Sequence, residues 1–75
     1  MATIAQGESC TIPQGFDDAV VTNTENRAGS YDIVIDGNST NKQIPAGVTQ
    51  QTPIHRNEAE ITNTGKAVLE VPNGE

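Results

Sequence analysis

The sequence has very few of the side chains on which metal sites, disulfides and most catalytic sites depend. Among 75 residues there is one cysteine, Cys10, one histidine, His55, and no tryptophan. A single cysteine excludes an internal disulfide, and together with one histidine it cannot supply the paired ligands of a structural zinc site. Calcium loops gather carboxylates at alternate positions, and Asp32, Asp36 and Glu70 do not form such a series. We therefore expect neither a metal nor a cofactor.

Basic residues and long apolar runs are also scarce. Four basic residues stand against ten acidic ones, for a net charge of −6. The basic residues are isolated in the sequence: Arg27, Lys42, Arg56 and Lys66. Because nucleic-acid binding relies on clustered Lys and Arg, no DNA or RNA partner is expected. The segment 1–6 lacks the basic and apolar regions of a signal peptide, and no stretch is long enough to span a membrane. We expect synthesis in a cytoplasm and no membrane partner.

The size of the chain predicts one domain, residues 1–75, that needs help to be stable. Below about 70 to 80 residues, a single core rarely supplies more than about 3 to 5 kcal/mol. Disulfides and metals are excluded above, so association with other chains is the remaining source of stability. The sequence thus favours a homo-oligomer.

No set of catalytic residues emerges. Cys10 would need a neighbouring base to act as a nucleophile, and His55 is the only candidate, so a buried structural cysteine is the preferred interpretation. Asp17 and Asp18 are adjacent, and adjacent residues of a strand point to opposite faces, so they do not form a carboxylate pair. We predict that the protein is not an enzyme.

One segment occurs twice. Residues 19–24 (Ala-Val-Val-Thr-Asn-Thr) return as residues 59–64 (Ala-Glu-Ile-Thr-Asn-Thr), 40 positions later. Ahead of them, residues 12–15 (Ile-Pro-Gln-Gly) resemble residues 44–47 (Ile-Pro-Ala-Gly), only 32 positions later. The difference predicts two related units, with a loop lengthened by 8 residues in the second. The Thr-Asn-Thr segments are interpreted as hairpin turns rather than ice-binding ladders, because two copies are too few for a ladder.

Short strands separated by turns account for most of the chain. Residues 31–36 and 58–62 alternate apolar and polar side chains, which is the period of a half-buried strand. Asp36-Gly37 is a strong hairpin signal, and Pro53 indicates an edge or the end of a strand. The expected strands are residues 3–6, 9–12, 18–22, 31–36, 42–44, 48–54, 58–62 and 66–71, of which the first two are weak.

These patterns predict an all-β fold, a small sandwich or barrel of about six or seven short antiparallel strands, with two related hairpin units. Residues 1–11 are expected to be an arm or an edge strand. The predicted core comprises the apolar residues of the inward faces together with both aromatics: Ile12, Phe16, Val21, Tyr31, Ile33, Ile35, Ile44, Val48, Ile61, Leu69 and Val71.

Three valines fall on the opposite faces of the predicted strands. Val20, Val34 and Val68 are either isolated exposed residues or parts of an interface, and we carry them forward as a candidate interface.

The chain resembles one family in the order of its motifs over residues 12 to 71. An Asn-Thr turn, the alternating strand of residues 30–35, the Pro-Ala-Gly corner at residues 45–47 and a Thr-rich strand are similar to the small capsid decoration, or cement, proteins of tailed phages. Residues 63–71 repeat this order. The resemblance implies a subunit, often trimeric, that binds the outside of a capsid and joins neighbouring capsomers, with the virion surface as its final location.

The leading functional hypothesis is accordingly a non-enzymatic structural protein whose partners are copies of itself and a major capsid protein or another large protein lattice. One alternative is a small acidic phage inhibitor that blocks a host enzyme or a nucleic-acid site. Another is an adhesive or carbohydrate-binding β-module, for which two aromatic residues are few.

Overall fold

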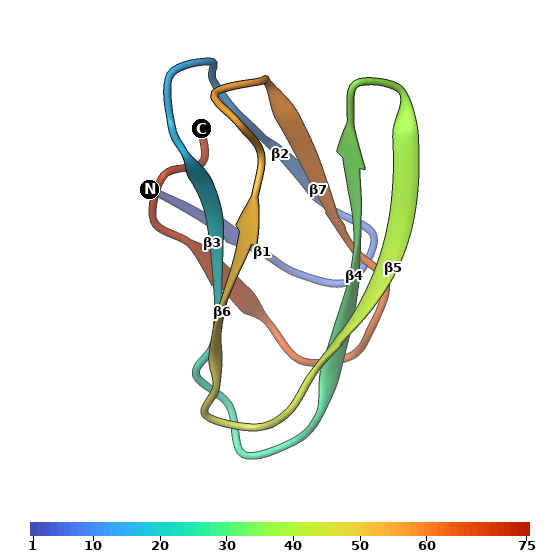
Figure 1. Cartoon of the computed structure of the whole chain (residues 1–75). Helices are drawn as coiled ribbons and strands as arrows, with labels where there is room; N and C mark the ends of the chain where they lie inside the picture. Colours follow the sequence, from blue (N-terminus) through green and yellow to red (C-terminus); the bar gives the residue numbers. More distant parts are fainter.

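The computed structural model describes residues 1–75 as eight short strands in two four-stranded sheets that pack face to face (Figure 1). The strands are β1 (Ala2–Ile4), β2 (Ser9–Ile12), β3 (Asp18–Asn23), β4 (Gly29–Ile35), β5 (Asn38–Ile44), β6 (Thr49–Pro53), β7 (Ala59–Asn63) and β8 (Leu69–Val71). The chain forms no helix that could cross a membrane. The predicted all-β sandwich is confirmed, and the barrel alternative is not formed.

The strand order identifies the type of sandwich. The first sheet has the order β1-β8-β3-β6 and the second β2-β7-β4-β5, and all pairings are antiparallel. This is the strand order of a jelly roll, a double-sheet antiparallel fold of eight strands. β1 and β2, which contain most of residues 1–11, are each the outer strand of a sheet.

Alternation in the sequence produces the strands, and turn residues end them. In β4 and β7, residues with buried side chains alternate with more exposed ones, as predicted. The only two-residue hairpin joins β4 to β5 through Asp36 (φ 51°) and Gly37 (φ 78°), and the Asp-Gly signal is confirmed. The second strand of this hairpin begins at Asn38, four residues earlier than the sequence indicated.

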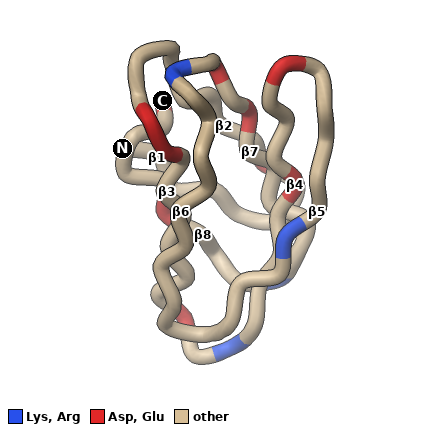
Figure 2. The backbone as a smooth tube through the Cα atoms, viewed as in Figure 1, with Lys and Arg blue, Asp and Glu red and all other residues tan.

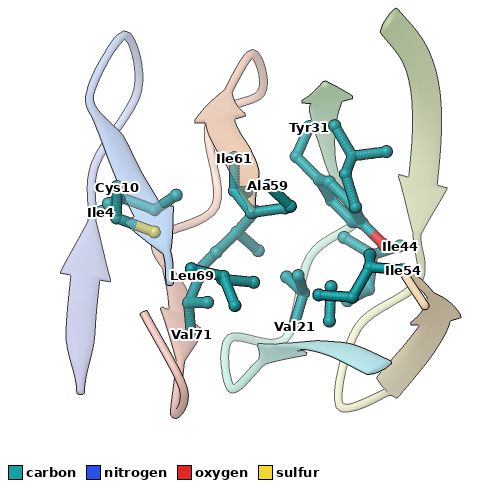
Figure 3. Packing of buried hydrophobic residues seen from close by; sticks show 13 residues of the cluster. Ile4, Cys10, Val21, Tyr31, Ile44, Ile54, Ala59, Ile61, Leu69 and Val71 are labelled. Carbon is teal, nitrogen blue, oxygen red and sulfur yellow. The ribbon is translucent and has the colours of Figure 1, made fainter. Parts of the chain in front are cut away.

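The core lies between the two sheets and is contributed by every strand except β6, which Ile54 follows directly. Figure 3 shows the buried side chains, with Ile4 and Cys10 toward the β1–β2 side and Tyr31 beside Ile44 and Ile54 toward the β5–β6 side. The buried cluster consists of Ile4, Cys10, Ile12, Ala19, Val21, Tyr31, Ile33, Ile44, Ile54, Ala59, Ile61, Leu69 and Val71. Eight of the predicted members are therefore correct, and Ile35 and Val48 pack against the cluster while partly exposed.

One predicted core residue is wrong. Phe16 is 41% exposed, because it lies in the turn between β2 and β3, beyond the end of the sheets, where no facing strand covers it. Ile54 occupies the interior instead, one residue after β6, although the preceding Pro53 had marked a strand end.

The Thr-Asn-Thr segments are crossovers between the sheets, and the hairpin interpretation is wrong. β3 and β4 belong to different sheets, as do β7 and β8. At each crossover a fully buried asparagine holds the backbone. Asn63 Nδ2 donates to the carbonyls of Ile4 (2.9 Å) and Ala67 (2.8 Å), and its Oδ1 accepts from the N–H of Gly65 (2.9 Å). Because three backbone groups are hydrogen-bonded to this side chain, it is a structural element of the crossover.

Asn23 repeats this arrangement in the first half of the chain. Its Nδ2 donates to the carbonyls of Ile44 (3.2 Å) and Arg27 (2.8 Å), and its Oδ1 accepts from the N–H of Glu25 (3.0 Å). Every partner stands 40 positions from its equivalent at Asn63. The two asparagines therefore have the same structural role in the two repeats.

The spacing of 40 holds along the whole chain, so the expected lengthened loop does not exist. Strands β1 to β4 correspond in order to β5 to β8, and exchanging the two sets converts one sheet order into the other. Within this register seven residues are identical in the repeats: Ile4/Ile44, Gly7/Gly47, Pro13/Pro53, Ala19/Ala59, Thr22/Thr62, Asn23/Asn63 and Thr24/Thr64. The segment 44–47 is therefore equivalent to 4–7, and its likeness to 12–15 was coincidental.

Candidate functional site

The structure separates the three valines proposed as an interface. Val20 lies on the outer face of the β1-β8-β3-β6 sheet, and Val68 precedes β8 at the far end of that sheet. Val34 lies on β4, in the other sheet. All three are partly exposed, but they form no common patch. Their use as an interface stays a prediction, to be tested one residue at a time.

Cys10 and His55 are not brought together. The Cys10 side chain is buried between the sheets, and its sulfur lies so close to Gly74 that a Cβ there would meet it at 2.9 Å. Burial raises the pKa of the Cys10 thiol, and the negative charge of Glu60 adds to this effect. His55 is exposed in the turn between β6 and β7. The predicted structural role of Cys10 agrees with its burial.

The most distinctive surface is the end of the sandwich where the β2–β3 loop meets the β6–β7 turn. The N–H of Arg56 donates to the Phe16 carbonyl (3.0 Å), and the N–H of Gly15 donates to the Arg56 carbonyl (3.1 Å). The Asp17 carbonyl accepts from the N–H of Ile54 at 2.9 Å. We call the surface formed by Gly15, Phe16, Asp17, His55 and Arg56 the Phe16 tip. Its backbone is fixed, so its exposed side chains project from a rigid base.

The turn beneath the tip is strained. His55 and Arg56 have φ values of 50° and 65°, and the N–H of Asn57 donates to the Ile54 carbonyl (2.9 Å), which closes the turn. Side chains disfavour this left-handed region, and a non-glycine residue held there costs about 1 to 3 kcal/mol. The β4–β5 hairpin places glycine at the second position of its turn, whereas this turn keeps a histidine and an arginine.

The tip carries an exposed aromatic ring and an exposed guanidinium, on two residues whose backbones are hydrogen-bonded to one another. Phe16 and Arg56 are equivalent residues of the two repeats. Phe16 and the terminal Met1 are the only large hydrophobic residues that are exposed. Arg56 Nε lies 3.3 Å from Asp17 Oδ1, but the two side chains are 74% and 79% exposed, so this pair contributes little to stability. Aromatic residues and arginine are the types enriched in the centres of protein–protein contacts.

A shallow acidic hollow borders the tip. It has a volume of about 420 Å³ and lies against β4 and β7, next to the β4–β5 turn. Its lining residues are Gln14, Val34, Asp36, Gly37, Asn57, Glu58, Ala59 and Glu60. No group of three or more His, Cys, Asp or Glu side chains has the arrangement of a metal site. Figure 2 shows acidic residues near this end of the molecule, with the basic residues scattered. Apart from Arg56, the end is negatively charged.

Sequence reasoning missed the Phe16 tip because it treated Phe16 as core. A signal was present in the repeat: with a spacing of 40, Phe16 aligns with Arg56, a residue that the sequence placed in a loop. The positive φ values at His55 and Arg56 had little signal: histidine is enriched among non-glycine residues with positive φ, but arginine is not. Asp17 and Asp18 lie at the entry to β3, where Asp17 is exposed and Asp18 partly buried.

Comparison with protein-family models, curated proteins and solved structures gives no match for this chain. What the site can do is therefore argued from its geometry alone. An exposed aromatic ring and an exposed cation on one hydrogen-bonded tip, next to an acidic hollow, suit contact with another macromolecule.

Proposed function

We propose that the protein is a structural subunit that binds the outer surface of a phage capsid or another large protein shell and stabilises it. The observation that carries this proposal is the Phe16 tip. An exposed phenylalanine sits on a strained but firmly hydrogen-bonded base, at one end of a small domain in which Met1 is the only other large hydrophobic residue that is exposed. Strain retained at a surface turn is expected where the side chains at that turn are used.

The charges at this end define the shell surface that would fit. Phe16 needs an apolar pocket, and the carboxylates of Asp36, Glu58 and Glu60, which line the neighbouring hollow, need basic groups opposite. Arg56 adds one cation within this acidic surround. The shape of the domain suits the role, because the 31 Å long axis and 17–18 Å cross-section let it stand on a shell on one narrow end. Copies bound at neighbouring positions would stabilise the lattice by mass action.

Binding of the purified protein to purified shells, measured by co-sedimentation, tests the proposal. Phe16→Ala should weaken binding by about 30-fold or more, the loss typical of a central aromatic contact. The fold should remain intact, because the ring is 41% exposed. The matched control is Pro45→Ala, which removes exposed apolar surface from the opposite end of the sandwich and should leave binding unchanged.

The valine interface is tested in the same assay. Val20→Glu, Val34→Glu and Val68→Glu are made singly and together, and each should leave the fold largely intact. If one of the three valines lies in the interface, only the variant at that position should weaken assembly among the three single variants. If the triple variant binds shells as well as the wild type, the valines are not an interface. If Phe16→Ala binds as well as the wild type, the Phe16 tip is not the shell contact. A protein that binds no shell at all refutes the proposed function.

A further inference from the structure

Strand β5 is a long, open sheet edge. It spans seven residues, Asn38–Ile44, of which only Ile44 is buried, and the four residues from Asn38 to Asn41 are exposed in succession. Figure 1 shows it along the margin of its sheet, paired with β4 on one side only. An unpaired edge presents backbone donors and acceptors to any second strand.

The other three edges are short or partly closed. β2 is covered at Thr11, which exchanges two backbone hydrogen bonds with Glu75 (3.3 and 2.8 Å). β6 carries Pro53, which has no N–H to offer, and β1 is only three residues long. With seven residues, β5 is therefore the longest open edge of the two sheets.

The register of the hairpin shows which backbone groups face outward. The residues that flank the Asp36–Gly37 turn form a hydrogen-bonded pair, and pairs alternate along an antiparallel ladder. This alternation directs the N–H and C=O groups of Ser39, Asn41 and Gln43 away from β4. The Gln43 carbonyl confirms the assignment, because it accepts a hydrogen bond from Gln50 Nε2 of β6 (2.8 Å). Ser39 and Asn41 are left to pair with another strand.

We propose that this edge pairs antiparallel with the same edge of a second copy, about a two-fold axis at Thr40. Ser39 of each copy then lies opposite Asn41 of the other, and the two pairs exchange four backbone hydrogen bonds. A register centred on Asn41 would instead require the Gln43 carbonyl, which Gln50 already occupies. The contact does not depend on binding to a shell. Its test is therefore independent of the test of the proposed function.

The side chains are complementary in this register. The two Thr40 residues face one another at the axis, a favourable cross-strand pair. Lys42 lies opposite Asn38 of the second copy and diagonal to its Asp36, so opposite charges meet twice and like charges do not meet. The occupant that this edge fits is thus another copy of the chain.

Blocking the outward edge tests the pairing by analytical ultracentrifugation of the full chain. Ser39→Pro removes an N–H that β4 does not use and adds a ring facing the second copy, so we expect the dimer Kd to rise about 100-fold or more. Gln51→Pro makes the same change at an outward position of β6 and should leave the dimer intact. A protein that is monomeric at all concentrations overturns the proposal, as does a dimer that survives Ser39→Pro.

Cross-linking tests the register with variants that barely perturb the fold. Thr40→Cys should form an intermolecular disulfide on mild oxidation, since the two positions face each other at the axis. Asn38→Cys and Lys42→Cys should form no intermolecular disulfide when each is oxidised alone. A mixture of the two variants should cross-link, because position 38 of one copy faces position 42 of the other. Cys10 does not compete, because it is buried. Cross-linking of either single variant in place of Thr40→Cys overturns the assigned axis.

Discussion

Replacing Asn63 with alanine should remove a large part of the stability of the fold. The substitution deletes three hydrogen bonds, two of them to the carbonyls of Ile4 and Ala67, in residues that are 3% and 0% exposed. An unsatisfied buried group costs about 1 to 3 kcal/mol, so the loss is about 3 to 5 kcal/mol. A domain of this length has about 4 to 11 kcal/mol in total.

The repeat supplies an internal comparison. Asn23→Ala deletes the equivalent three bonds, but one of the carbonyls released belongs to Arg27, which is exposed and regains a hydrogen bond from water. We expect a loss of about 2 to 3 kcal/mol at this position, smaller than at Asn63.

Urea denaturation followed by circular dichroism measures both free energies of unfolding. The expected order of stability is wild type, then Asn23→Ala, then Asn63→Ala, with the last partly unfolded in water. A loss below about 1 kcal/mol at Asn63 would refute the reasoning, because water would then have replaced the side chain at the crossover. Equal losses of unfolding free energy in the two variants would show that the access of water to the Arg27 carbonyl does not reduce the cost of Asn23→Ala.

Three further predictions concern the turns. The N–H of Val68 donates to the Glu25 carboxylate (2.6 Å) and lowers the pKa of that group. The ionised Glu25 carboxylate therefore stabilises the fold above its unfolded pKa, and this stabilisation is lost as pH falls through its folded pKa. The difference in Tm between the wild type and Glu25→Gln should accordingly become smaller in acid. His55→Asn combined with Arg56→Gly should stabilise the fold by about 1 kcal/mol in thermal melts, by relieving positive φ, and should weaken shell binding. Gly65→Ala should destabilise by about 1 to 3 kcal/mol in urea, because its Cβ meets a backbone nitrogen at 2.8 Å.

The sequence determined the strands well and their connections poorly. Alternation in residues 31–35 and 59–62 reports which side chains are buried, and Asp36-Gly37 specifies a hairpin, so these features were predictable. Thr-Asn-Thr does not distinguish a hairpin from a crossover, since an asparagine side chain satisfies backbone groups in either. That choice depends on carbonyls such as that of Ile4, 59 positions away. Phe16 was misplaced for a similar reason: burial of a turn residue depends on which segment crosses above it.

The repeat explains why function is best sought where the two halves differ. Symmetric features of the chain, such as Asn23 and Asn63, are committed to the fold, because each closes its own crossover with the same three bonds. Departures from symmetry are not needed to close it. One of them is Phe16, which stands where the second repeat has Arg56. Phe16 carries the proposed shell contact, whereas the proposed self-association uses the β5 edge. Phe16→Arg, which makes the two repeats alike at this position, should therefore keep the fold and the dimer while losing shell binding.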